Sequence, residues 1–132
     1  MGIRPLGTLA PPLGGDAWDG SALDLTHVMP VELRSLVAAY LEDSPVIHAW
    51  MGYSTDVIGG RFEVPGGNAI SSDGVFYWRY DAANYVREYG IDIPEEALAH
   101  FQKRQWKPPI FTRDELIEVH DRLTELLEYR WD

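Results

Sequence analysis

The sequence contains no cysteine and carries little positive charge. Its 132 residues include 11 lysines and arginines against 21 aspartates and glutamates, which gives a formal net charge of −10. The absence of cysteine excludes disulfides, thiolate metal sites and a cysteine nucleophile, and it fits a reducing compartment. A field of this sign repels nucleic acid, whose binding depends on cationic contacts to phosphate. We therefore expect a cytoplasmic protein that does not bind nucleic acid.

Long apolar runs are also missing from the chain. No stretch approaches the ~20 apolar residues that a membrane-spanning helix needs. The first fifteen residues, MGIRPLGTLAPPLGG, lack the continuous apolar segment of a signal peptide. Hydrophobic residues nevertheless make up 45% of the chain, with five Trp and seven Tyr. This composition predicts a folded protein of ordinary domain size that has no membrane association.

Local signals along the chain predict an α+β fold, with a small antiparallel sheet of about three to four strands packed against about four helices. Apolar periodicity and proline positions predict helices over 30–44, 81–90, 94–105 and 112–132, and strands over 45–54, 61–64 and 75–79. Residues 1–26 are rich in proline and glycine, so we expect an N-terminal arm that packs on a single α+β domain formed by residues 27–132.

Four short signals mark a turn and helix ends in the sequence. Asp73-Gly74 is typical of a tight turn. Asp81 suits the N-cap of the helix that follows it, and Gly90 suits the left-handed position that ends that helix. Thr112 and Glu115 have the spacing of a capping box.

The stretch SSDGVFYWRYDAANYVREYG (residues 71–90) concentrates aromatic and charged side chains at a strand-to-helix junction. Large side chains alternate on both faces of VFYWR, a pattern that indicates a central strand covered on two sides. Trp, Tyr and Arg are also the residue types that anchor protein interfaces. We therefore interpret most of this stretch as core, and keep its turn and cap positions as candidates for binding.

No motif in the chain identifies a catalytic chemistry. The glycine-rich residues 59–74 lack the Gly-Lys-Ser/Thr ending of a phosphate-binding loop, and no GxSxG sequence occurs. His27, His48, His100 and His120 are far apart in sequence, and none has the paired spacing of metal ligands. Asp16 and Asp19 resemble a calcium loop only faintly. We predict no catalytic residue, no cofactor and no metal.

The basic patch KRQWK (residues 103–107) has two readings. Cations at the end of a helix complement the helix dipole, and we favour this interpretation. Alternatively, an exposed Trp106 between the cations could stack on a nucleotide base.

We expect a non-enzymatic, acidic protein-binding module, such as an immunity protein or antitoxin that neutralises a basic partner protein. The partner would be steered by charge and held by a few anchors, and the chain would be a monomer or a weak homodimer. The predicted partner-binding residues are Trp50, Asp56, Arg61, Glu63, Asp73 and Arg79. The alternative is a small-molecule-binding protein or enzyme with a pocket between sheet and helices. The residues predicted to line that pocket are Trp50, Tyr53, Trp78 and Tyr85.

Overall fold

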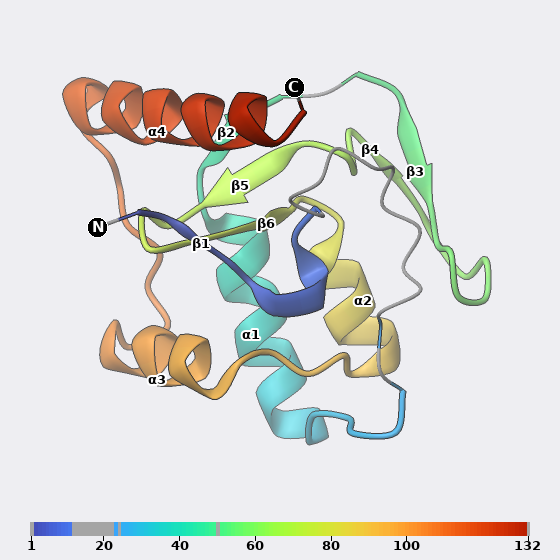
Figure 1. The fold of residues 1–132 in the computed structure, drawn as a ribbon. Coiled ribbons are helices and arrows are strands. Elements are labelled where there is room, and N and C mark those ends of the chain that lie inside the picture. The colour runs from blue at the N-terminus through green and yellow to red at the C-terminus, as the bar shows by residue number, and fades with distance from the viewer. Residues whose placement is uncertain (1, 12–22, 24, 50, 132) are drawn as a thin grey trace.

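The computed structural model describes residues 2–11, 23, 25–49 and 51–131. These residues form an α+β fold with four α-helices, as the sequence predicts (Figure 1). In chain order the elements are β1 (Arg4–Pro5), a short 3-10 helix (Gly7–Leu9), α1 (Val31–Asp43), β2 (Val46–His48), β3 (Tyr53–Thr55), β4 (Glu63–Pro65), β5 (Ile70–Ser72), β6 (Phe76–Arg79), α2 (Ala82–Tyr89), α3 (Glu95–Lys103) and α4 (Arg113–Trp131).

The main sheet has the strand order β1-β6-β5-β2 and is mixed rather than purely antiparallel. β5 runs antiparallel to β2 and β6, whereas β1 runs parallel to β6. The difference from the predicted antiparallel sheet comes from β1, which has only two residues and therefore no periodicity to read. Tertiary hydrogen bonds define it, because the N–H groups of Arg4 and Leu6 donate to the carbonyls of Val75 and Tyr77.

β5 was also not predicted, because the sequence around it reads as a glycine- and serine-rich loop. Its residues Ile70–Ser72 are fully covered by neighbouring elements and pair with the central strand β6. The predicted turn at Asp73-Gly74 joins these two strands, and Gly74 adopts a positive φ of 91°.

The single strand predicted over 45–54 is two strands, which belong to different sheets. β2 pairs with β5 in the main sheet, whereas β3 pairs with β4 in a separate two-stranded sheet. Gly52, just before β3, has a φ of 102°, a conformation that glycine adopts without steric cost. We call residues 51–66, which contain β3, its turn and β4, the ribbon. Figure 1 shows the ribbon at the right-hand side of the molecule, away from the linker between α3 and α4.

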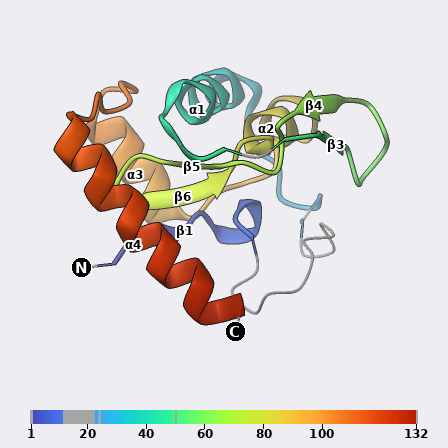
Figure 2. The same ribbon diagram turned by 90° about the horizontal axis from the view of Figure 1, so that it is seen from above.

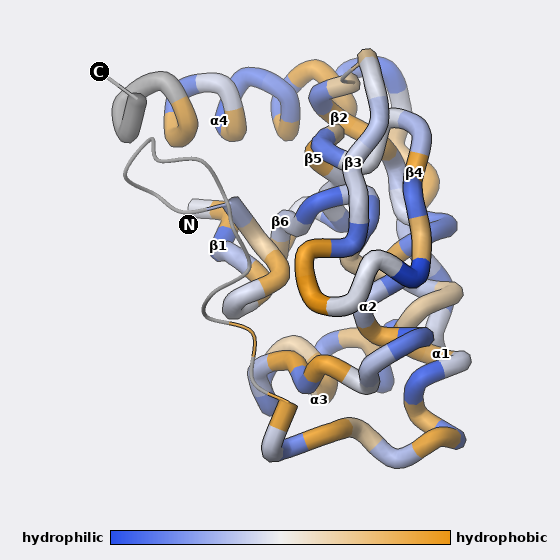
Figure 3. Tube along the Cα trace, turned by 90° about the vertical axis from the view of Figure 1, so that its right-hand side faces the viewer, coloured by the Kyte–Doolittle hydropathy of each residue, from blue (hydrophilic) through white to orange (hydrophobic). Residues whose placement is uncertain are grey.

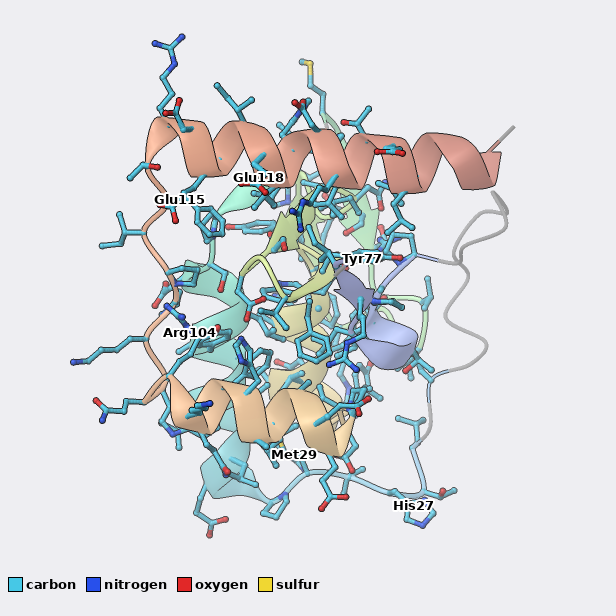
Figure 4. The ribbon with its side chains drawn as sticks, turned by 60° about the vertical axis from the view of Figure 1, so that its left-hand side comes forward. His27, Met29, Tyr77, Arg104, Glu115 and Glu118 are labelled. Carbon is cyan, nitrogen blue, oxygen red and sulfur yellow. The ribbon has the colours of Figure 1, made fainter. Side chains whose placement is uncertain are left out.

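Helices cover both faces of the main sheet. α4 lies on one face, and α1 and α2 lie on the other (Figures 1 and 2). Phe76 and Trp78 of β6 belong to the core on the α1–α3 side. Tyr77 belongs to the core beneath α4 (Figure 4), together with Leu123 and Leu127 of that helix. Successive side chains of β6 therefore contribute alternately to the two cores, as the pattern of VFYWR predicts.

Hydrophobic residues recur on the side of α4 that faces the sheet (Figure 3). Along α4, Val119, Leu123 and Leu127 are buried and Leu126 is partly buried, whereas Leu116 is exposed. None of the helices in the described ranges combines the length and the apolar composition that a membrane-spanning segment requires.

The beginning of the predicted N-terminal arm is part of the body. Ile3, Leu6, Leu9 and Ala10 are all buried in the two cores. Residues 12–22, which include the candidate calcium ligands Asp16 and Asp19, lie outside the described residues.

Two of the predicted caps are confirmed, and one is used differently. Gly90 ends α2 in the left-handed conformation, with a φ of 68°. Thr112 and Glu115 form the capping box, in which the N–H of each residue donates to the side chain of the other at 2.9 Å and 3.2 Å. Asp81 occupies the N-cap position of α2, but its side chain makes no capping hydrogen bond. Its carboxylate has other partners, described below.

Candidate functional site

The turn of the ribbon is organised around the buried carboxylate of Asp56. One carboxylate oxygen accepts hydrogen bonds from the N–H groups of Ile58 at 2.8 Å and Gly59 at 3.3 Å. The other oxygen accepts the N–H of Arg61 at 2.8 Å and the hydroxyl of Tyr89 from α2. Asp56 thus closes the turn and ties it to the body.

These contacts keep the Asp56 carboxylate ionised. Burial alone would raise its pKa, but hydrogen bonds from the Tyr89 hydroxyl and from three backbone N–H groups outweigh burial and hold the pKa below its ordinary value. Burial and the bond to Asp56 raise the pKa of Tyr89 in turn. The charged carboxylate of Asp56 therefore stabilises the turn of the ribbon. Only 5% of the residue is exposed to solvent.

A second buried carboxylate, Asp81, joins the ribbon to the junction between β6 and α2. Arg79 donates two hydrogen bonds to it, from Nε at 2.9 Å and from Nη2 at 2.8 Å. The hydroxyl of Ser54, in β3 of the ribbon, donates to the same carboxylate at 2.8 Å. The ribbon is therefore held at its strand as well as at its turn.

Gly67 allows this close approach just beyond β4. A Cβ atom at that position would lie 1.8 Å from Oγ of Ser54 and 2.9 Å from its Cβ. The backbone carbonyl of Gly67 also accepts a hydrogen bond from the N–H of Asp81 at 3.2 Å. A residue with any side chain would separate the ribbon from Asp81.

The outer side of this fixed ribbon exposes apolar side chains. Met51 is 94% exposed and Tyr53 is 67% exposed, and Val57 at the turn is also exposed. Figure 3 shows the apolar bend at the turn in orange. Arg61 and Glu63 are exposed on the same segment, and the Arg61 guanidinium lies 5.1 Å from the centre of the Tyr89 ring. The ribbon therefore presents two large apolar groups with charged neighbours.

Asp73 is a third buried carboxylate, at the turn between β5 and β6. One oxygen accepts the N–H groups of Val75 and Phe76 at 3.0 Å and 2.9 Å, and the other accepts the Tyr40 hydroxyl at 2.6 Å. Burial and this bond to Asp73 raise the pKa of Tyr40 well above its ordinary value. Nε2 of His100 lies 3.2 Å from the same Asp73 oxygen, without the alignment of a hydrogen bond.

The structure describes five of the six predicted partner-binding residues and separates them into two groups. Arg61 and Glu63 are exposed on the ribbon, where a partner can reach them. Asp56, Asp73 and Arg79 are buried and bonded within the chain, so their described role is structural. Trp50 lies outside the described residues.

Of the four residues predicted for the alternative pocket, Trp50 lies outside the described residues, and the other three do not come together around an opening. Trp78 and Tyr85 are completely buried, whereas Tyr53 is exposed. These three residues therefore share no open pocket.

The sequence interpretation missed a pocket at the C-terminal end of α3. Its volume is about 560 Å³, and it is lined by His100, Lys103, Arg104, Gln105 and Lys107.

Trp106 is partly buried against the core, not exposed as the nucleotide-stacking alternative requires. Among the described residues, no group of three or more His, Asp or Glu side chains is arranged to hold a metal ion.

Comparison with known proteins assigns no family to the chain. No protein-family model, no curated protein and no solved structure matches it. The function proposed below therefore rests on the geometry of the chain's own residues.

Proposed function

We propose that this protein is a non-enzymatic binding module that holds a basic partner protein on the ribbon. The observation that carries the proposal is the exposure of Met51 and Tyr53 on a segment that the hydrogen bonds of Asp56 to Tyr89 and of Ser54 to Asp81 hold on the body. Exposed apolar side chains that lie together on one segment are typical of interaction sites, whereas single scattered ones are not. A segment that is already ordered loses little conformational entropy when it binds.

The net charge of −10 supports a basic partner. Opposite charge raises the rate of encounter and disfavours acidic competitors, while the apolar anchors supply most of the affinity. An immunity protein or antitoxin that covers the working surface of a basic protein has these properties. The cysteine-free chain suits the cytoplasm, where we propose that the complex forms.

A pair of nearly equivalent side chains makes the proposal testable. Met51 on the ribbon and Ile110 in the linker between α3 and α4 are 94% and 95% exposed, so an aspartate at either position leaves the core intact. The ribbon and the linker between α3 and α4 lie on opposite sides of the molecule in Figure 1. The experiment immobilises wild-type protein, Met51→Asp, Tyr53→Asp and Ile110→Asp, and passes a lysate of the source cells over each at low and moderate salt.

We expect one basic protein to be retained by wild type and by Ile110→Asp. Each ribbon variant should weaken its binding by tenfold or more, since loss of an interface anchor costs about 2 kcal/mol or more. Retention should also fall with salt. A basic protein retained equally by all four proteins, or no retained protein at either salt, would contradict the proposal.

A further inference from the structure

The segment around the end of α3 has a charge opposite to that of the rest of the chain. Residues 97–113 include four cations, Lys103, Arg104, Lys107 and Arg113, and no aspartate or glutamate. This segment carries +4, whereas the remaining 115 residues carry −14. The partial charge at a helix C-terminus amounts to about −0.5, so it accounts for only part of this concentration of cations.

The backbone after α3 bends so that three of these cations, Lys103, Arg104 and Lys107, line the pocket. Gln105 and Trp106 both adopt left-handed conformations, with φ of 57° and 62°. Such conformations are unfavourable for residues other than glycine, so the surrounding contacts must hold them. Trp106 packs against the core, and Arg104 Nε donates to the carbonyl of Lys107 at 3.1 Å. The bend therefore keeps Lys107 beside Arg104.

The wall of the pocket offers donors and no carboxylate. All five lining residues are basic or amide side chains. The nearby carboxylate, Asp73, is fully buried behind His100, whose side chain is 23% exposed. Arg104 is held by its bond to Lys107, and its charge acts on the hydroxyl of Tyr40. Figure 4 shows Arg104 beside the linker from α3 to α4.

We propose that this pocket binds a small molecule with a phosphate or carboxylate group. Arginine and lysine are the side chains that bind such oxyanions most strongly, and an anchored arginine loses little entropy when it does so. A small anion can occupy the pocket without approaching the acidic surface elsewhere. A nucleic acid strand extends beyond the pocket and meets that repulsion, and the partly buried Trp106 offers it little stacking surface.

An NMR titration of the full chain tests this site. Backbone amide shifts are followed on addition of inorganic phosphate, citrate or a single-stranded oligonucleotide, at constant ionic strength maintained with sodium chloride. We expect saturating shifts confined to residues 100–107, with a Kd of about 1 mM or tighter for at least one small anion. Saturation by phosphate alone identifies a phosphoryl ligand, and saturation by citrate alone identifies a carboxylate ligand.

The decisive variant is Lys103→Gln combined with Lys107→Gln, because both side chains are exposed and their replacement leaves the fold unchanged. We expect binding of the small anion to weaken by tenfold or more. Arg87→Gln, which removes an exposed cation on α2, is the matched control and should bind as wild type does. Shifts that do not saturate, an affinity unchanged in the double variant, or saturation by the oligonucleotide alone would each overturn the proposal.

Discussion

Arg79 and Asp81 form a buried ion pair with two parallel hydrogen bonds, of 2.9 Å and 2.8 Å. Only 10% of the arginine side chain and 1% of the aspartate side chain are exposed. This paired geometry is the strongest that arginine and a carboxylate form. Because Ser54 of the ribbon shares the same carboxylate, the pair fixes the position of the proposed binding surface.

Asp81→Ala should strongly destabilise the protein. It leaves the guanidinium of Arg79 buried without its counter-charge, and the loss of one partner of a buried pair costs about 3–5 kcal/mol. Urea unfolding measures the change in free energy. Glu42→Ala is the control, because it breaks the exposed pair between Glu42 and Arg87, which contributes about 1 kcal/mol or less. Equal losses in the two variants would contradict a structural role for Asp81.

Gly67→Ala should destabilise the protein by about 1–3 kcal/mol, the usual effect of overpacking. The new methyl group would overlap Oγ of Ser54, so strand β3 must move. Adding Ser54→Gly removes the overlap, and the double variant should lose less stability than the sum of the two single losses. Gly2→Ala, which meets nothing within 4 Å, should be neutral in the same urea titration. If the stability losses of the two single variants simply added, the contact with Ser54 would not be the reason that residue 67 must be glycine.

The contribution of Asp56 should disappear in acid. The pKa of its folded state is lowered, so its stabilising effect is present above the ordinary aspartate value of about 3.9 and is lost as the pH falls below that value. Wild type should therefore be more stable than Asp56→Asn near neutral pH, and the difference should narrow in acid. Urea midpoints of both proteins across the acid range provide the measurement. A difference that is constant with pH would show that the charge of Asp56 is not what the turn requires.

Tyr40→Phe should lower the free energy of unfolding by about 1–3 kcal/mol, because it removes a donor from the buried carboxylate of Asp73. The raised pKa of Tyr40 adds a pH signature. The stabilisation is present below the ordinary tyrosine value of about 10 and is lost as the pH rises above it. The stability difference between wild type and Tyr40→Phe should narrow in alkali. Equal stability of the two proteins at neutral pH would contradict a structural bond to Asp73.

The elements that could be predicted from sequence are those whose signals are local. Three such signals depend only on residues close to them in sequence. They are the aromatic alternation of residues 75–79, the glycine at position 90 and the capping box of Thr112 and Glu115. β5 could not be predicted, although it pairs with its neighbour β6 across a tight turn, because its three residues read as part of a glycine- and serine-rich loop. β1 could not be predicted, because it has only two residues and is defined by pairing with the distant strand β6. This pairing joins segments more than seventy residues apart in sequence.

The difference between local and distant signals also explains how much of the candidate site could be predicted. Asp56 and Asp73 are carboxylates in turns, and sequence alone does not distinguish an exposed one from a buried one. Their deciding partners, Tyr89 and Tyr40, are each 33 residues away. The pocket at α3 has a sequence signal, the basic segment 97–113 in an acidic chain, but only the folded structure shows that Lys103, Arg104 and Lys107 line one pocket.

Hydrogen exchange of the complex with the captured basic protein tests the central claim most directly. Amide exchange is compared, segment by segment, between the free protein and the complex. If the ribbon is the docking surface, residues 51–66 gain protection, and the linker around Ile110 exchanges as before. Protection that falls on α4 or on the linker, with the ribbon unchanged, would contradict the account.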